Sequence, residues 1–300
     1  EELRPVAPDR RAVLHEAAMA GSLGAYLRSL RRRNPVYEAL RSSLRGATVQ
    51  DAAAIRLNLQ RLRAIPADPG PRYIIVDAAG ARLWLFERGR ISDSMKVVVG
   101  RQDQQTPAMA AFIRHAVYNP YWNVPRDLVQ HKVAPEVIRH GVAYVQRERL
   151  QLLSDYSPSA HPVTVEQVDW TAVADGRQKV RVRQLPGAGN MLGKVKFMFP
   201  NSLGVYLHDT ADLSAMKRSN RRLSSGCVRV EDAQRLGRWL FEGIQGPVPT
   251  TPEAKVPLPR PVPVYITYLT RVPGPRGAVP QEDFYGRDKA ALRPLLPRRA

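Results

Sequence analysis

The chain of 300 residues has a single cysteine, Cys227, which excludes an internal disulfide. It has no run of 18 or more apolar residues, so no segment is expected to span a membrane as a helix. The first residues also lack the apolar stretch that is typical of a secretory signal. The chain is therefore expected to be either cytosolic or a mature form whose export signal has been removed.

Acidic residues are scarce: 27 aspartates and glutamates stand against 46 lysines and arginines, for a net charge of +19. Such a balance favours an anionic partner, which could be nucleic acid, a membrane surface or a cell-wall polymer. The basic residues are spread along the chain, and no nucleic-acid-binding motif or basic stripe with interleaved aromatics is present. A generally basic, solvated surface is therefore favoured over a dedicated nucleic-acid site.

Residues 11–65 have a helical pattern. Asn34 and Pro35 suit the N-cap and first position of a helix, and Ile55, Leu59 and Leu62 fall on one face of another. The sequence "PADPGP" then interrupts the pattern. We therefore predict a helical N-terminal region over residues 1–68.

Short β-branched and aromatic segments between glycine-containing turns predict strands after this boundary. From about 127 to 190 the pattern becomes largely helical, which predicts an insertion. A helix is expected at 231–244, with Ile244 on its apolar side. The proline-rich segment 246–263 is expected to be extended and to lead into a last strand at 264–269. The prediction is an α+β fold: a mostly β domain over 69–270 with an inserted helical lid, followed by a tail over 271–300.

Two of the predicted strands each have one apolar face and one face with polar or reactive side chains, because alternate residues of a strand share a face. In "VYLHD", Tyr206 and His208 lie opposite the apolar residues, and in "CVRV", Cys227 and Arg229 do so. If the strands are neighbours, these four side chains converge. An imidazole could then take the thiol proton, and a guanidinium could stabilise the thiolate.

The motif "YLHDT", 18 residues between its histidine and Cys227, and "SSGCVRVED" resemble the L,D-transpeptidases with the YkuD catalytic domain. The resemblance is to the large Gram-negative branch typified by YcbB. It covers roughly residues 58–290, because further blocks agree in the same order: "NLQRLRAIP", "RYIIVD", "KVVVGRQDQQTP", "NPYWNVP", "VDW", "GKVKFMFPN" and "VYITYL".

The resemblance implies a sandwich-like β barrel that acts on peptidoglycan stem peptides in the periplasm, without a metal or other cofactor. Cys227 is expected to attack the meso-diaminopimelate carbonyl of a tetrapeptide stem, and His208 to act as base. D-alanine would leave, and a diaminopimelate amine of another stem would accept the acyl group. The remaining expected site residues are Ser225 and Gly226 at the oxyanion and Arg229, Tyr206, Trp122 and Asp209 at the substrate.

Two departures from the family pattern stand out. The wider family has histidine where this chain has Ser225, although the YcbB-like branch shares the serine. Larger relatives carry a scaffold and a wall-binding module before the catalytic domain, and the helical region here leaves little room for one.

Several alternatives stay open. Water could replace the amine, which would make the protein a carboxypeptidase or amidase, or the acceptor could be a protein that becomes attached to the wall. A sortase is disfavoured, because its histidine lies much farther upstream of the cysteine. A non-catalytic wall-binding scaffold and a basic nucleic-acid binder are weaker alternatives. The sequence does not indicate a protein partner.

Overall fold

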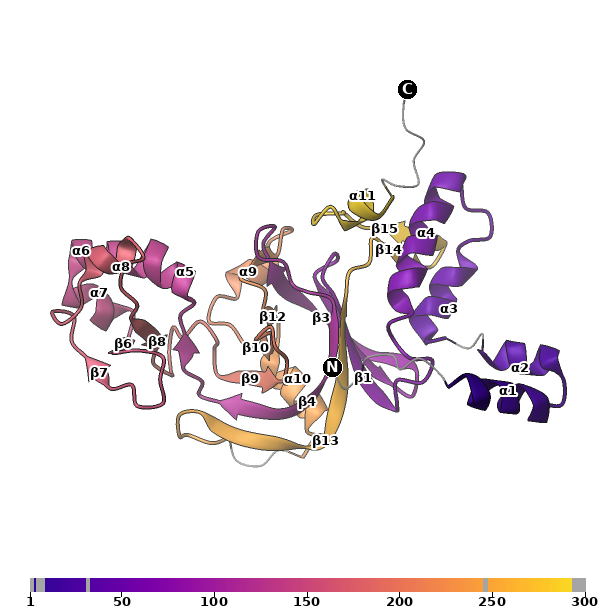
Figure 1. The fold of residues 1–300 in the computed structure, drawn as a ribbon, viewed down its shortest axis with the longest axis horizontal. Coiled ribbons are helices and arrows are strands. Elements are labelled where there is room, and N and C mark those ends of the chain that lie inside the picture. Colours follow the sequence, from indigo (N-terminus) through magenta and orange to yellow (C-terminus); the bar gives the residue numbers. More distant parts are fainter. Residues whose placement is uncertain (1–2, 4–8, 31–32, 245–247, 293–300) are drawn as a thin grey trace, which may run out of the picture.

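The largest sheet has nine strands in the order β11-β3-β12-β10-β9-β4-β13-β1-β2, and β2 also pairs with β3, so that eight of the strands form a closed barrel. A separate sheet, in the order β5-β8-β6-β7, belongs to a lobe on one side of this barrel, and helices α1–α4 lie on the other side (Figure 1). The structure is a computed structural model that describes residues 3, 9–30, 33–244 and 248–292. The fold is α+β, as predicted.

The strands are β1 (Arg72–Asp77), β2 (Arg82–Glu87), β3 (Arg90–Gly100), β4 (Met109–Tyr118), β5 (Trp122–Asn123), β6 (Leu150–Leu153), β7 (Pro162–Val163), β8 (Arg181–Gln184), β9 (Val195–Met198), β10 (Leu207–His208), β11 (Arg222–Ser224), β12 (Val228–Val230), β13 (Ala254–Thr267), β14 (Arg271–Gly274) and β15 (Gly277–Pro280). The helices are α1 (Arg10–Met19), α2 (Leu23–Leu30), α3 (Pro35–Ser42), α4 (Val49–Leu62), α5 (Arg126–Leu128), the π-helical η1 (Val129–Val133), α6 (Ala134–His140), α7 (Val142–Arg147), α8 (Trp170–Ala174), α9 (Ser214–Lys217), α10 (Ala233–Leu240) and α11 (Arg287–Leu292).

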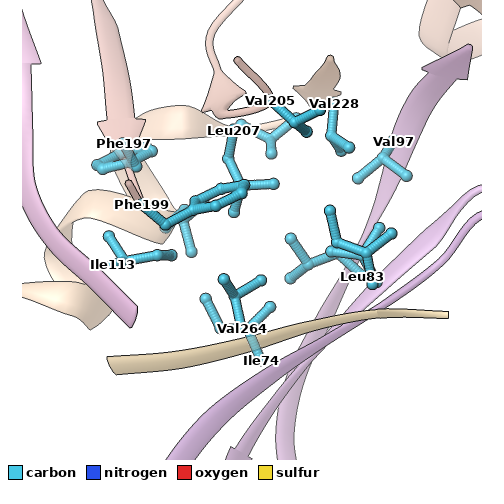
Figure 2. Close-up of a cluster of buried hydrophobic side chains, with 14 of the residues drawn as sticks. Ile74, Leu83, Val97, Ile113, Phe197, Phe199, Val205, Leu207, Val228 and Val264 are labelled. Carbon is cyan, nitrogen blue, oxygen red and sulfur yellow. The ribbon is translucent and has the colours of Figure 1, made fainter. Parts of the chain in front are cut away.

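The barrel interior is filled by aliphatic and aromatic side chains that alternate along the strands. Figure 2 shows Ile74, Leu83, Phe197, Leu207 and Val228 meeting there. Each of these side chains is fully buried, and burial of such a residue stabilises the fold by about 1.5–3 kcal/mol. This core fixes which face of β10 and β12 points outward, because a one-residue slip would turn every side chain of a strand over.

Strand β1 is buried on both faces. Ile74 and Val76 point into the barrel, whereas Tyr73 and Ile75 pack against the helices α3 and α4. The Tyr73 ring also stacks on Phe86 with centroids 4.6 Å apart. A strand covered on both sides needs an unbroken apolar run, and "RYIIVD" supplies one.

The predicted N-terminal helices are present with the expected caps. The Asn34 side chain accepts a hydrogen bond from the N–H of Tyr37, and Pro35 is the first residue of α3. Ile55, Leu59 and Leu62 of α4 are all buried, as the apolar spacing predicted. No helix within the described ranges is both long enough and apolar enough to cross a membrane.

Three expectations about secondary structure were wrong. The segment 127–190 is not simply helical, since β6, β7 and β8 lie within it. Ile244 is 66% exposed because α10 ends at Leu240, and the strand through 264–267 is the end of β13 rather than the last strand. The expected tail instead contains β14, β15 and α11. The proline-rich segment is extended from Ala254; residues 246–247 of that segment and 293–300 of the tail lie outside the described residues.

Candidate active site

The two strands that carry the candidate chemistry are direct neighbours. β10 and β12 run parallel, with Leu207 opposite Val228 and His208 opposite Arg229. Leu207 and Val228 point into the barrel core (Figure 2). Because residues alternate along a strand, His208 and Arg229 lie on the other face, next to Tyr206 and Cys227. The fold therefore brings an imidazole, a guanidinium, a phenol and a thiol to one surface.

Cys227 lies immediately before β12 and is half-buried. Its Sγ donates a hydrogen bond to the Gly204 carbonyl over 3.6 Å. Burial raises the pKa of the thiol, whereas hydrogen bonds from the backbone and hydroxyl of Tyr206, together with the charge of Arg229, act in the opposite direction. The net effect is a raised pKa, so the side chain is a neutral thiol near pH 7 and needs a base before it can attack a carbonyl.

His208 is only 3% exposed, and its Nδ1 lies 2.6 Å from the carbonyl oxygen of Asp209. A carbonyl oxygen can only accept, so Nδ1 carries the proton and Nε2 of the neutral ring is left as an acceptor. Burial, followed by the positive charges of Arg229 and Lys196, lowers the pKa of His208 to about 3. The imidazole is therefore neutral at physiological pH and has one nitrogen available to take a proton.

Asp209 orients this histidine through its backbone. The Asp209 N–H donates to the Val195 carbonyl over 2.9 Å, and its carboxylate accepts from the Lys194 N–H over 2.8 Å. The carboxylate packs so closely on Gly193 that a Cβ there would lie 2.3 Å from it, and Gly193 has φ +62°. These contacts hold the Asp209 carbonyl at the position that selects the His208 tautomer.

The loop before Cys227 is held by a serine that the sequence analysis did not select. The buried Ser224 hydroxyl donates to the Cys227 carbonyl over 2.6 Å and accepts from the Gly226 N–H over 3.2 Å. Gly226 has φ +109°, a conformation that favours glycine. Ser225 is exposed. The Gly226 N–H, expected at an oxyanion, is thus already bonded within the loop.

A second support comes from Thr106, which is fully buried. Its hydroxyl donates to the Gly226 carbonyl and accepts from the Gly100 N–H, each over 2.9 Å. The Tyr285 hydroxyl in turn donates to the Gly100 carbonyl over 2.7 Å and accepts from the Thr106 N–H over 3.3 Å. Sequence reasoning missed both residues because these bonds join segments far apart in the chain; the only signal was the "QQTP" block.

Arg229 is half-buried beside the thiol. Within the described part of the chain it has no hydrogen-bond or ion-pair partner, although the charges of Asp212 and Cys227 favour its charged form. Burial outweighs this attraction and lowers the pKa of Arg229. A partly desolvated guanidinium without a carboxylate is suited to bind an anionic ligand.

Trp122 comes from the inserted lobe and not from the strands of the barrel. It belongs to β5 in the sheet of the inserted lobe, pairs with Gln184 of β8 and packs against the core of that lobe.

The described residues form no group of three histidine, cysteine, aspartate or glutamate side chains that could hold a metal ion.

Comparison with known proteins identifies the family of this chain. Residues 71–264 match the family model described as the L,D-transpeptidase catalytic domain, YkuD. A Haemophilus influenzae protein named "Putative L,D-transpeptidase" is 29% identical over 242 residues, which are 78% of this chain and 48% of that protein. The chain thus spans about half the length of this relative.

Two solved structures match part of the chain at low identity and low TM-score. An L,D-transpeptidase from Mycobacterium smegmatis is 10% identical, with a TM-score of 0.32, over 65% of this chain and 58% of that one. An L,D-transpeptidase from Mycobacterium tuberculosis with a faropenem-derived adduct is 11% identical, with a TM-score of 0.31, over 65% and 60%. The family match alone covers more than half of the chain. The chain belongs to the family of YkuD L,D-transpeptidase catalytic domains.

Proposed function

We propose that this chain is a peptidoglycan L,D-transpeptidase with Cys227 as its nucleophile. The single observation that supports this most is the parallel register of β10 and β12, which puts a neutral thiol beside Tyr206 on the same face as a neutral imidazole. A neutral pair of this kind works by general-base catalysis, because the proton must leave the sulfur as the sulfur attacks.

The first half of the reaction forms an acyl-enzyme. Cys227 Sγ attacks the carbonyl carbon of the meso-diaminopimelate residue in a tetrapeptide stem, and its proton passes to His208 Nε2. The new S–C bond gives a tetrahedral intermediate, which collapses with cleavage of the C–N bond to D-alanine. His208 then donates the proton to the departing amine, so that the imidazole is neutral again.

The second half transfers the acyl group. The side-chain amine of diaminopimelate on another stem attacks the thioester, a C–N bond forms, the C–S bond breaks, and the amine proton passes through His208 to the sulfur. The product is a crosslink between two third-position residues. Hydrolysis differs only in that water takes the place of the amine, and attachment of a protein to the wall differs only in the acceptor.

The charge of the site favours such a substrate. Arg229 beside Cys227 is suited to a stem carboxylate, and the net charge of +19 favours encounter with an anionic polymer. We place the protein outside the cytoplasm, in the periplasm, where this polymer is. If binding to isolated sacculi did not weaken in high salt, the electrostatic part of the proposal would be wrong.

The inserted lobe, residues 127–190 together with β5, is proposed to act as a lid over the donor stem, with Tyr206 and Trp122 along the donor groove. A lid would keep water from the acyl-enzyme and so favour transfer over hydrolysis. The YcbB-like branch has such an insertion, and we assign the chain to that branch on this basis.

Product analysis tests the proposal. Tetrapeptide stems are incubated with the protein, with Cys227→Ala and with Cys227→Ser, and the products are identified by mass. A crosslinked dimer and free D-alanine from the wild type alone would support transpeptidation. Tripeptide and D-alanine without dimer would indicate a carboxypeptidase, and unchanged stems would favour a non-catalytic wall-binding protein.

A further inference from the structure

A cavity of about 880 Å³ lies at the end of the barrel opposite the inserted lobe. The lobe leaves the barrel where β4 ends at Tyr118 and returns where β9 begins at Val195, and these two residues pair. The cavity lies at the other end of β4, around Met109, and its walls include the segment that follows β9. Its volume falls in the range of small-ligand sites.

Residues on two sides of this cavity are connected to the Cys227 loop by hydrogen bonds or by chain neighbours. On one side lies Leu203, whose neighbour Gly204 accepts the hydrogen bond of the Cys227 thiol. On the other lies Arg287, which donates to the Thr106 carbonyl over 3.0 Å, and Thr106 holds Gly226. Gly204 and Gly226 therefore connect both walls of the cavity to the segments that hold Cys227.

The wall by Leu203 has a defined shape. Asn201, which also lines the cavity, donates to the carbonyls of Phe199 and Val205 over 2.7 and 2.8 Å. It accepts from the N–H groups of Leu203 and Val205, each over 3.1 Å. A turn whose polar groups are paired in this way is preformed and needs no ordering when a ligand binds.

Arg287 supplies the charge of the opposite wall. Its Nε and Nη2 donate to Gln105 Oε1 over 3.1 and 2.9 Å, whereas Nη1 has no partner among the residues that the structure describes. The neighbouring acidic groups are engaged elsewhere: Asp288 pairs with Arg61, and Asp283 accepts from the Tyr268 hydroxyl. The guanidinium also lies 4.9 Å from the ring centroids of both Tyr268 and Tyr285. It is thus a fixed cation with a free edge.

We propose that this cavity binds the acceptor stem peptide, with Arg287 holding one of its carboxylates. The inference rests on the proposed function, since a transpeptidase must bring two stems to one sulfur, and the lobe side is already assigned to the donor. Arg287, Arg61 of α4 and Ala64, which follows that helix, all line the cavity and lie outside the 71–264 match to the family. The acceptor amine approaches the thioester from this cavity, opposite the lid.

The test separates the two halves of the reaction. A tripeptide stem ending in diaminopimelate serves as acceptor because it has no D-alanine to lose, and a tetrapeptide serves as donor. The same tripeptide with carboxamides in place of its carboxylates is the matched ligand. For Arg287→Gln we expect the KM for the carboxylate acceptor to rise about tenfold or more, the KM for the amidated acceptor to stay unchanged, and Arg287→Lys to restore most of the loss.

Ala64→Trp provides a variant that leaves the Arg287 hydrogen bonds in place. Ala64 is exposed and lines the cavity, so the indole should fill it and raise the acceptor KM, whereas Ala18→Trp at an exposed position of α1 should not. In Ala64→Trp and Ala18→Trp, which keep the hydrogen bond from Arg287 to the Thr106 carbonyl, the rate of acylation by a carbapenem should equal that of the wild type.

An unchanged acceptor KM in both Arg287→Gln and Ala64→Trp would overturn the inference, as would equal losses for the carboxylate and amidated acceptors. Slower carbapenem acylation in Ala64→Trp would overturn it too, because the cavity would then serve the donor. If instead the wild type were not acylated at all, the proposed function itself would fail.

Discussion

The loop that carries Cys227 and the inserted lobe are stabilised by different kinds of contact. Backbone groups of the loop are bonded by side chains from distant parts of the chain, such as Thr106, with Tyr285 behind it. The lobe has its own sheet and its own core around residues such as Trp170 and Val182. A side-chain hydrogen bond of 2.9 Å from Gln104 to Asp127 links the lobe to the segment that contains Thr106.

This difference separates the roles of the two regions. The nucleophile and its base are positioned by the barrel, which is a continuous hydrogen-bonded ring. A lobe with its own core can open, close or unfold locally as one unit without disturbing that geometry. We therefore expect acylation of Cys227 to be insensitive to the stability of the lobe, and recognition of long substrates and exclusion of water from the acyl-enzyme to depend on it.

The largest effect is expected at the base. His208→Gln removes the acceptor nitrogen and should slow D-alanine release from a tetrapeptide by about 10²–10⁴-fold. Because burial and nearby cations lower the pKa of His208 to about 3, the wild-type rate should show no acid limb near pH 6.5. A loss of less than tenfold, or a limb at pH 6.5 that disappears in the variant, would contradict this role.

A matched pair of core truncations compares the two regions directly. Phe197→Ala in the barrel and Trp170→Ala in the lobe each remove a buried aromatic side chain and should each cost about 3–5 kcal/mol of local stability. Hydrogen exchange should show the Trp170→Ala loss confined to residues 122–184, with normal carbapenem acylation. Phe197→Ala should loosen the whole barrel and slow acylation. If both variants lost hydrogen-exchange protection over the same residues, the two regions would not be independent.

The next effect concerns the support of the loop. Thr106→Val leaves the Gly100 N–H and the Gly226 carbonyl unpaired, at a cost of about 1–3 kcal/mol for each buried group. Urea unfolding should show this loss, and D-alanine release should slow with it. Thr106→Ser keeps the hydroxyl and should behave nearly as the wild type. If Thr106→Ser lost as much stability as Thr106→Val, packing of the methyl group rather than the hydrogen bonds would hold the loop.

The smallest effect is on stability in acid. The pKa of His208 is about 3 in the folded protein, against an ordinary value of 6.5, so between these values the unfolded chain binds more protons and stability falls as the pH drops. Asp77 acts in the opposite direction, because burial raises its pKa to about 6. Comparison with His208→Gln isolates the histidine: between pH 6 and 4 the wild type should lose up to about 1.4 kcal/mol more per pH unit. Parallel curves would exclude a neutral buried His208.

The sequence was sufficient to predict the fold class, the helical N-terminal region and the faces of the two site strands. These features follow from local periodicity: apolar residues recur at helical spacing in α4, and they alternate in "VYLHD" and "CVRV". The resemblance in "SSGCVRVED" added the reaction, and the family match covers this motif.

Other features could not be read from the sequence because they depend on long-range contacts. Thr106, Ser224 and Tyr285 meet around Gly226 only after the barrel has closed. The strands of the lobe were missed because β6 and β8 have four residues each, too few for a periodic signal to outweigh the helices beside them. Ile244 was placed on the apolar side of the helix because helical spacing does not show where α10 ends.

The most direct test of the central claim is intact-mass analysis of the protein after incubation with a carbapenem, with Cys227→Ala as the control. The account predicts one covalent adduct on the wild type and none on the variant, because the Cys227 thiol shares a face with the His208 imidazole and is accessible to an acyl donor. An unmodified wild-type protein, or an adduct that persists in Cys227→Ala, would contradict it.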